Sequence, residues 1–327
     1  MTPGGPDGPD EGEFGWIERL LRPLTRGHPG ALDLLDDAAV LTPREGHDLV
    51  VTKDAMVAGV HFLADDPLDT VAAKLLAVNL SDLAAKAAEP VGYFLSVAWP
   101  RDVTWAEKQR FAEGLRQAGD AWGLPLLGGD TVSTPGPLTL TATLMGEVPA
   151  GGMVRRATAR PGDLLMVSGF IGDGWLGLQA ARGQLPDAGG YLAARYRTPQ
   201  PRLDLIPALR RFARASADVS DGLLADAGRI AIASGFAAEI ALEQVPISEP
   251  AAAWLAVQPD EAAARLALAT GGDDYQVLCA IDPAELPAIR AAGLDLSVVG
   301  RVRLGEGVTA VFGGRSMPAP RLGWTHP

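Results

Sequence analysis

The stretch ADVSDGLLAD, residues 217–226, constrains the fold more than any other part of this sequence. Its first residues are apolar and strand-like and its last residues have the spacing of an amphipathic helix, so a strand passes directly into a helix. Asp218, Ser220 and Asp221 lie at this junction. A buried carboxylate is costly unless a positive partner compensates its desolvation. The sequence therefore predicts a cation at the end of this strand, with a simple helix cap by Asp221 as the alternative.

Isolated aspartates stand at the edges of several other predicted elements. Most are flanked by Gly, Ala or Leu rather than by Lys or Arg. Each one alone could be a helix cap or a turn residue, because aspartate favours both positions. Together they indicate a shared, oxygen-lined cation site, drawn from Asp36, Asp37, Asp54, Asp82, Asp130, Asp218, Asp221, Asp273 and Asp274.

Magnesium is the cation that this pattern favours. The sequence has neither the Cys–His spacing of zinc sites nor a twelve-residue EF-hand loop. Carboxylates spread along a chain suit Mg²⁺, which keeps several waters and usually arrives with substrate phosphates. Glycines beside the aspartates, as in LLGGDT and TGGDDY, permit close approach of the backbone to a phosphate.

Composition argues against several classes of protein. The net charge is −12, and the sequence shows no basic cluster typical of nucleic-acid binding. It has no charge-free apolar run long enough for a membrane span, and its acidic start, MTPGGPDGPDEGE, lacks the pattern of a signal peptide. We therefore expect a cytoplasmic protein with no nucleic-acid and no membrane partner. The single cysteine, Cys279, is expected in a core strand.

Strands and helices are mixed along all 327 residues without strict alternation. Residues 104–123 carry a threonine cap, a glutamate three residues later and a closing glycine, which predicts a helix. The mixed pattern begins again after PAGG, residues 149–152. We expect an α+β protein with a disordered tail over 1–12 and two domains, 13–150 and 151–327.

Common catalytic motifs are absent from the sequence. It has no P-loop, no G-x-G-x-x-G after a strand and no nucleophile elbow. The glycine-bearing turn SGFIGDGWLG, residues 168–177, could bind phosphate, but a plain structural turn explains it equally well.

Several motifs together resemble those of the thiamine-monophosphate kinase family, and the resemblance runs from about residue 13 to the C-terminus. They occur in the family's order: LDDAAVL, TKDAMVAGVHF, AVNLSDLAAKAAEP, LLGGDT, RRATARPGDLLMVSG, ADVSDGLLAD and GGDDYQVL. The motif DVSDGL is shared by the wider aminoimidazole ribonucleotide synthetase-like superfamily. VAGVHF, NLSDLAA and GGDDY point more narrowly to the thiamine-phosphate enzymes.

The resemblance implies transfer of the ATP γ-phosphoryl group to thiamine monophosphate, with several Mg²⁺ ions per site. It also implies an N-terminal α/β domain that forms a barrel with its twin in a homodimer, and a C-terminal α/β domain that completes the active site. The implied metal ligands are Asp37, Thr52, Asp54, Asp82, Asp130, Asp218 and Asp221. The implied ATP contacts are Asp130, Arg156, Ser220 and Lys53, and the implied thiamine-phosphate contacts are His61, Asp273 and Trp324.

No side-chain nucleophile or base is expected, because phosphoryl transfer needs positioning and charge neutralisation above all. The acceptor is itself a phosphate, with a second pKa of about 6, and is largely ionised at neutral pH. Structural explanations stand beside two of the substrate contacts: His61 could be a structural histidine and Trp324 an anchor for the C-terminal tail.

The chain departs from the family pattern at four places. Leu35 stands where a glycine is usual, and Lys53 where a small hydroxyl residue is usual. Lys86-Ala87 replaces Met-Gly, and Asp273 replaces a glutamate. The Lys53 ammonium could stand in for one cation or point away, so the number of metal ions stays open.

Three other functions remain open from the sequence. A sibling enzyme of the superfamily is the nearest, although selenophosphate synthetase and the hydrogenase-maturation enzyme would need cysteines at places other than Cys279. The second is a Mg²⁺-dependent phosphatase for small phosphate esters. The third is an acidic nucleotide-binding module without catalysis.

Overall fold

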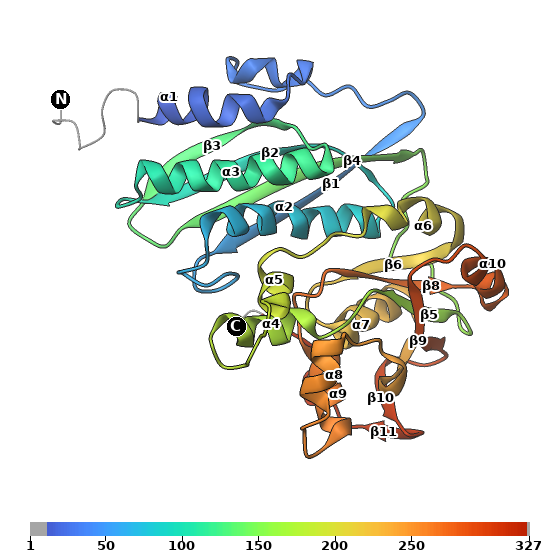
Figure 1. The fold of residues 1–327 in the computed structure, drawn as a ribbon. Coiled ribbons are helices and arrows are strands. Elements are labelled where there is room, and N and C mark those ends of the chain that lie inside the picture. The colour runs from blue at the N-terminus through green and yellow to red at the C-terminus, as the bar shows by residue number, and fades with distance from the viewer. Residues whose placement is uncertain (1–11, 326–327) are drawn as a thin grey trace. The chain divides into compact units, whose positions relative to one another are not determined.

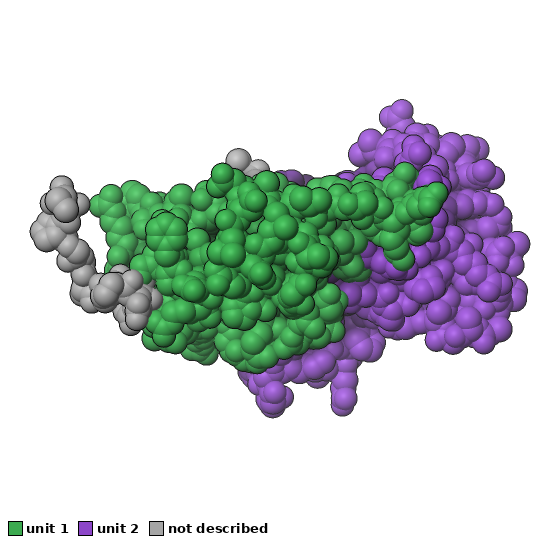
Figure 2. Space-filling model, turned by 90° about the horizontal axis from the view of Figure 1, so that it is seen from above, with its two compact units in different colours: residues 1–79, 90–147 green, residues 80–89, 148–327 purple. Residues whose placement is uncertain are grey.

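The computed structural model describes residues 12–325, which fold into two compact units. Of the described residues, unit 1 comprises 12–79 and 90–147, and unit 2 comprises 80–89 and 148–325 (Figure 2). Residues 80–89, which the sequence analysis placed in the N-terminal domain, pack with unit 2. Of the expected tail over 1–12, residues 1–11 lie outside the described part. Helices and one sheet are present in each unit, which confirms the α+β architecture.

The sheet of unit 1 has four strands in the order β1-β4-β2-β3. They are β1 (His47–Val57), β2 (Glu89–Pro100), β3 (Leu126–Thr134) and β4 (Thr139–Pro149). The helices α2 (Leu68–Ala85) and α3 (Trp105–Trp122) lie against one face of this sheet (Figure 1). Because α3 connects β2 to β3, these two strands run parallel.

Alternation along β2 places the core of unit 1 under the helices. Tyr93, Leu95 and Trp99 are buried, whereas Ser96 between them is exposed. Trp99 packs edge-to-face on Phe111 of α3, with ring centroids 5.4 Å apart, and Trp16 packs on Trp99 in the same way at 5.5 Å. Aromatic packing therefore joins the start of the described chain to the sheet and to α3.

The helix α3 has the ends that the sequence predicts. Thr104 Oγ1 accepts a hydrogen bond from the Glu107 N–H at 3.3 Å, and Glu107 Oε2 accepts one from the Thr104 N–H at 2.7 Å. Gly123 ends the helix at φ +65°, a left-handed conformation that glycine adopts without strain. The region before the sheet is a series of short turns of helix: α1 (Glu13–Trp16), η1 (Ile17–Leu21), η2 (Arg22–Thr25) and η3 (Pro29–Leu34).

Unit 2 is built on a seven-stranded sheet in the order β11-β10-β7-β9-β5-β8-β6. Its strands are β5 (Leu164–Ser168), β6 (Ala213–Val219), β7 (Ala237–Ala241), β8 (Gln276–Ile281), β9 (Leu296–Arg303), β10 (Gly307–Phe312) and β11 (Arg315–Met317). The pairs β5–β8, β5–β9 and β6–β8 are antiparallel, and β7–β10 is parallel.

The middle of this sheet is buried on both faces, which explains the continuous apolar runs of β5 and β8. Leu165 and Val167 pack into the cluster under α7 (Leu223–Ser234). Leu164, Met166 and Cys279 pack into the opposite cluster, under α6 (Ile206–Phe212) and α10 (Leu286–Ala291). The expected core position of Cys279 is thus confirmed.

A third group of helices covers the glycine-bearing turn after β5. It contains α4 (Asp173–Ala181), α5 (Tyr191–Arg197), α8 (Glu249–Leu255) and α9 (Glu261–Thr270). Trp175 and Trp254 meet edge-to-face in its core at 5.6 Å. Across residues 12–325, the helices lack the combination of length and apolar character that crossing a bilayer requires.

Candidate active site

The junction between β6 and α7 is a tight hinge over residues 218–222. Gly222 sits at φ +123°, and a Cβ there would lie 2.9 Å from the carbonyl carbon and oxygen of Thr270, so this position needs glycine. The backbone N–H groups of Ser220 and Asp221 both donate to Asp226 Oδ2, at 3.1 and 3.2 Å. The Asp226 carboxylate, in the first turn of α7, therefore stabilises the backbone of the hinge.

Asp226 was not among the sequence-predicted site residues, although it lies inside the quoted motif, five residues after Asp221. It is fully buried, and burial raises its pKa to about 6 against the opposing effect of Arg229. Arg229 forms ion pairs with both Asp226 and Asp221. The Asp221 carboxylate, a predicted metal ligand, is thus held by a guanidinium about two turns into the helix.

Asp218, the penultimate residue of β6, is a buried carboxylate that faces the C-terminal turn of α2. Burial, followed by repulsion from Asp82 and Asp226, raises its pKa well above the ordinary value of an aspartate. A hydrogen bond from Ser81 and the charge of Lys86 lower that pKa. The hinge and α2 therefore bring two predicted metal ligands, Asp82 and Asp218, into one electrostatic cluster within unit 2.

Lys86 belongs to the same cluster. Its Nζ donates to the carbonyl oxygen of Ser216 at 2.5 Å, and the Ser216 hydroxyl donates to the carbonyl oxygen of Ala85. Burial and repulsion from Arg156 lower the pKa of Lys86 to about 8, while Asp218 and Asp82 raise it. The sequence signal was available, because Lys86 stands four residues after Asp82 on a helix.

Arg156, a predicted ATP contact, lies within electrostatic range of Lys86. Its Nε is buried and has no hydrogen-bond partner among the described residues. A buried guanidinium donor without a partner is costly. An anionic ligand at this position would satisfy it.

The GGDDY loop packs directly on the hinge. Asp273 donates its backbone N–H to the Ser220 carbonyl oxygen, and Tyr275 donates to that of Val219, both at 2.8 Å. Asp273 and Tyr275 have φ of +69° and +51°, and the Tyr275 hydroxyl donates to Asp273 Oδ1 at 3.1 Å. Two non-glycine residues with positive φ, one of them a predicted substrate contact, within three positions are typical of a functional loop.

The second aspartate of this motif has a different task. Asp274 accepts the backbone N–H groups of Gly172 and Gly174, at 2.8 and 3.0 Å, at the start of α4. It is buried, and burial raises its pKa to about 8 although the two amides lower it. The amides of the turn at 168–177 are thus used by the protein's own carboxylate. Of the two explanations for this turn, the geometry favours the structural one.

The C-terminal segment ends on the same hinge. The Trp324 N–H donates to the Asp221 carbonyl oxygen at 2.8 Å. A Cβ on Gly323 would lie 2.3 Å from that oxygen, which shows how closely the two segments approach. The Trp324 side chain remains 50% exposed, so an indole face is available beside the hinge.

The predicted ligands on the sheet of unit 1 lie on its two edge strands. Thr52 and Asp54 are on β1 and Asp130 is on β3, three inter-strand spacings away, or about 14 Å. This sheet by itself therefore does not bring Asp54 and Asp130 onto one ion. Lys53 is exposed and alternates to the face opposite Thr52 and Asp54, which are half-buried.

Asp37 and His61 lie outside the strands of unit 1. Asp37 is exposed in a bend, where its N–H donates to Asp36 Oδ1 at 2.8 Å. His61 follows β1, and its Nδ1 accepts the Val57 N–H at 3.1 Å. The Lys74 ammonium donates to the His61 carbonyl oxygen at 3.2 Å. These contacts support a structural role for the His61 Nδ1 atom.

Donor chemistry in unit 2 fits a hard cation. Asp82 and Asp218 supply carboxylate oxygens, and burial makes the Asp218 anion costly unless a positive charge is near. Considering residues 12–325 alone, no three His, Cys, Asp or Glu side chains are grouped as a metal site would require. A small carboxylate set is typical of Mg²⁺, which completes its shell with water and substrate phosphates.

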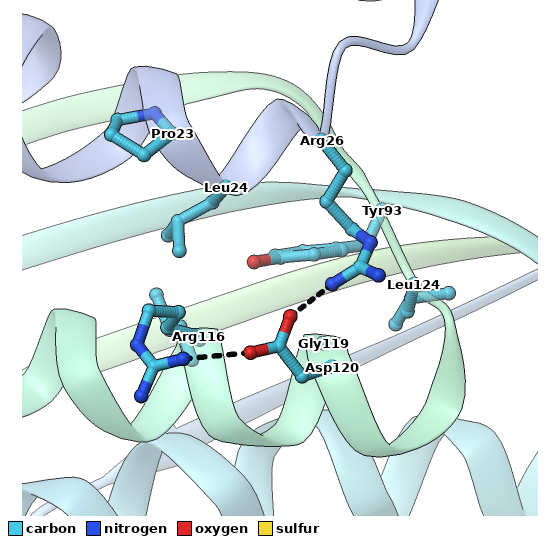
Figure 3. Close-up of a pocket in the computed structure, with 9 residues that line it drawn as sticks. Pro23, Leu24, Arg26, Tyr93, Arg116, Gly119, Asp120 and Leu124 are labelled. Atoms are coloured by element: carbon cyan, nitrogen blue, oxygen red, sulfur yellow. Dashed lines mark hydrogen bonds and ion pairs between the residues drawn. The ribbon is translucent and has the colours of Figure 1, made fainter.

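Unit 1 also contains a small, partly open hollow between the first helical turns and α3. Asp120 forms ion pairs there with Arg26 and Arg116 (Figure 3). The Tyr93 hydroxyl is buried and has no hydrogen-bond partner among residues 12–325. This hollow shares no residue with the predicted site.

Comparison with known proteins identifies the family of this chain. Residues 35–148 match the model of the AIR synthase related protein N-terminal domain, and residues 160–313 match that of the C-terminal domain. A thiamine-monophosphate kinase from Caulobacter vibrioides is 57% identical over 318 residues, which is 96% of this chain and 90% of the relative.

Two solved structures are also similar. The crystal structure of thiamine-monophosphate kinase from Stenotrophomonas maltophilia has a TM-score of 0.81 and 36% identity, covering 93% of this chain and 98% of that one. The structure described as "AaThiL complexed with AMPPCP and TMP" has a TM-score of 0.76 and 28% identity, covering 98% and 99%. The chain belongs to the AIR synthase related protein family and, within it, to the thiamine-monophosphate kinases.

Proposed function

We propose that this protein phosphorylates thiamine monophosphate to thiamine diphosphate, with ATP as the phosphoryl donor. The observation that carries the proposal is the hinge at 218–222, on which Asp82 of α2, Asp273 of the GGDDY loop and Trp324 of the C-terminal segment converge. The related structure that contains AMPPCP and TMP supports the choice of donor and acceptor.

The cation in this proposal is Mg²⁺. In unit 2 it would be held by Asp82 and Asp218, and Asp221 with the unit 1 residues Asp37, Thr52, Asp54 and Asp130 are the further candidate ligands. When bound, Mg²⁺ supplies neutralisation of the negative charge on the phosphate oxygens.

The protein's own groups then have two tasks. Arg156 would donate to nucleotide phosphates, which is supported by its buried Nε having no partner among the described residues. Ser220 is held in place from both sides, because Asp226 accepts its N–H and Asp273 donates to its carbonyl oxygen. A rigid hinge of this kind favours the in-line geometry on which phosphoryl transfer depends. Lys53, on the exposed face of β1, is the weakest of the proposed ATP contacts.

Thiamine monophosphate would lie at the GGDDY loop and the C-terminal segment. Its ring is cationic, so the Asp273 carboxylate and the half-exposed face of Trp324 offer complementary chemistry. His61 is a further proposed contact. The acceptor phosphate is largely ionised at pH 7 and attacks without a general base.

A homodimer is part of the proposal. Both edge strands of the unit 1 sheet carry predicted ligands, and β1 exposes Leu49 and Val51 on one face. Closing such a sheet against a second copy removes its open edges. Light scattering of the purified protein tests this, because a monomer at micromolar concentration would contradict it.

One assay tests the activity. The protein is incubated with ATP, Mg²⁺ and thiamine monophosphate, with unphosphorylated thiamine as the control acceptor. We expect thiamine diphosphate and ADP in equal amounts, and no thiamine monophosphate from thiamine. Free phosphate without thiamine diphosphate would indicate a phosphatase instead. ATP binding without turnover on any phosphorylated acceptor would indicate a non-catalytic module.

A further inference from the structure

The C-terminal end of α2 packs beside β6 close to the Asp218 carboxylate. Asp82 and Lys86 stand one turn apart on one side of the α2 end, and Ser216 and Asp218 stand two residues apart on one face of β6. The Lys86 ammonium contacts the Ser216 carbonyl oxygen at 2.5 Å, and the neighbouring Ser216 hydroxyl contacts the Ala85 carbonyl oxygen. The Lys86 ammonium thus contacts β6 two residues before the buried Asp218 carboxylate.

Charges of both signs act on this point. Asp82 and Asp218 attract the ammonium, Arg156 repels it, and Asp226 adds a further negative charge beside Asp218. Asp226 already has its own cation in Arg229. Lys86 is therefore one cation that the fold itself provides beside the Asp82–Asp218 pair.

We propose that Lys86 is a built-in counter-ion of Asp82 and Asp218, which keeps a divalent cation weakly bound there until the nucleotide arrives. An ammonium and a divalent ion beside the same two carboxylates repel each other, and that repulsion is strong in a half-buried site. A polyphosphate brings enough negative charge to accommodate both cations. Divalent binding is thereby coupled to nucleotide binding. The inference rests on the proposed function for the identity of the nucleotide only.

The test measures binding of Mn²⁺ alone, which takes oxygen ligands as Mg²⁺ does. Free Mn²⁺ is followed by electron paramagnetic resonance, without nucleotide, for the full-length protein and its variants. Lys86→Gln removes the charge and retains a donor for the Ser216 carbonyl oxygen, whereas Lys86→Arg retains the charge. We expect Lys86→Gln to lower the Mn²⁺ Kd by roughly tenfold, the size of one lost charge repulsion at a half-buried site, and Lys86→Arg to leave it unchanged.

Two controls assign the effect to this pair. Adding Asp218→Asn to Lys86→Gln is expected to abolish the gain in Mn²⁺ affinity. Lys108→Met, which removes a positive charge from α3 in unit 1, is expected to leave the Mn²⁺ Kd unchanged. Thermal unfolding in EDTA is measured for each variant, so that a loss of stability is separated from a change in affinity.

The outcomes are distinct. An unchanged Mn²⁺ Kd in Lys86→Gln overturns the inference and leaves Lys86 as a structural tie between α2 and β6. A tenfold tighter Kd that persists in the double variant overturns it as well. If the Kd shifts as expected but no thiamine diphosphate forms in the activity assay, the counter-ion stands and the proposed function fails.

Discussion

The backbone N–H of Trp324 donates a hydrogen bond to the carbonyl oxygen of Asp221 over 2.8 Å. The contact joins the last described residues to a hinge more than a hundred positions earlier, and it uses only backbone atoms. The indole itself is 50% exposed. The side chain of Trp324 can therefore be changed without removing the contact that anchors the segment.

Trp324→Ala tests whether the indole binds the acceptor. We expect the KM for thiamine monophosphate to rise by about tenfold, because a lost cation–π contact costs about 1 kcal/mol or more, with little change in the KM for ATP. Steady-state kinetics with each substrate varied measures both values. Trp324→Phe keeps an aromatic face and is expected to recover most of the loss. An alanine variant with unchanged kinetics and a lower melting temperature would make Trp324 a structural anchor.

Asp218→Asn tests the buried carboxylate of the hinge. The variant keeps the shape of the side chain and removes a charge whose burial is costly, so we expect an equal or higher melting temperature. We expect kcat to fall by about a hundredfold or more, the scale of a lost electrostatic contribution to the transition state. Asp130→Asn is expected to lower kcat similarly. Near-normal kcat with unchanged Mg²⁺ dependence would remove Asp218 from the site.

The parts of the fold that local sequence specifies were predictable. Thr104, Glu107 and Gly123 encode both ends of α3 in their own spacing, and the structure has those ends. The packing of residues 80–89 with unit 2, rather than with unit 1, was not predictable. It depends on Ala85 and Ala87 packing against strands more than seventy residues later, which no local pattern records.

In the candidate site, too, features set by local sequence were predictable and features set by distant contacts were not. The motif around Asp218 marks the hinge, because a carboxylate at the end of an apolar strand is a local signal. The role of Asp274 was hidden, since the amides that it caps lie about a hundred residues earlier. Lys53 is a different case. Strand alternation already indicated that Lys53 points away from Thr52 and Asp54, and the geometry assigns the ammonium near the carboxylates to Lys86.

Asp226→Ala tests the carboxylate that holds the hinge. The change leaves the N–H groups of Ser220 and Asp221 without their acceptor, so we expect a loss of roughly 2–4 kcal/mol in the free energy of unfolding. Asp226→Asn keeps one acceptor oxygen and is expected to lose less. Urea unfolding followed by circular dichroism measures both. Equal stability of the alanine variant and the wild type would show that the Asp226 carboxylate does not stabilise the hinge.

Asp274 makes stability depend on pH. Its pKa is raised to about 8 in the folded protein, against about 4 in an unfolded chain, so the folded state binds the proton more tightly. The stabilisation is complete below about pH 4 and is lost as pH rises towards 8, by up to about 1.4 kcal/mol per pH unit. Asp274→Asn is expected to flatten this slope between pH 5.5 and 8, measured by urea unfolding. Asp204→Asn, at an exposed carboxylate, is the control, and equal slopes in wild type and Asp274→Asn would contradict the assignment.

Tyr93→Phe tests the hollow in unit 1. The Tyr93 hydroxyl is fully buried and has no hydrogen-bond partner within residues 12–325, and burial raises its pKa far above the ordinary value. A polar group buried without a partner costs about 1–3 kcal/mol, which phenylalanine avoids while filling the same space. We expect the variant to be as stable as the wild type or up to about 1 kcal/mol more stable, by urea unfolding, with unchanged activity. A loss of more than about 1 kcal/mol would show that the hydroxyl has a bridging partner, such as a bound water in this hollow.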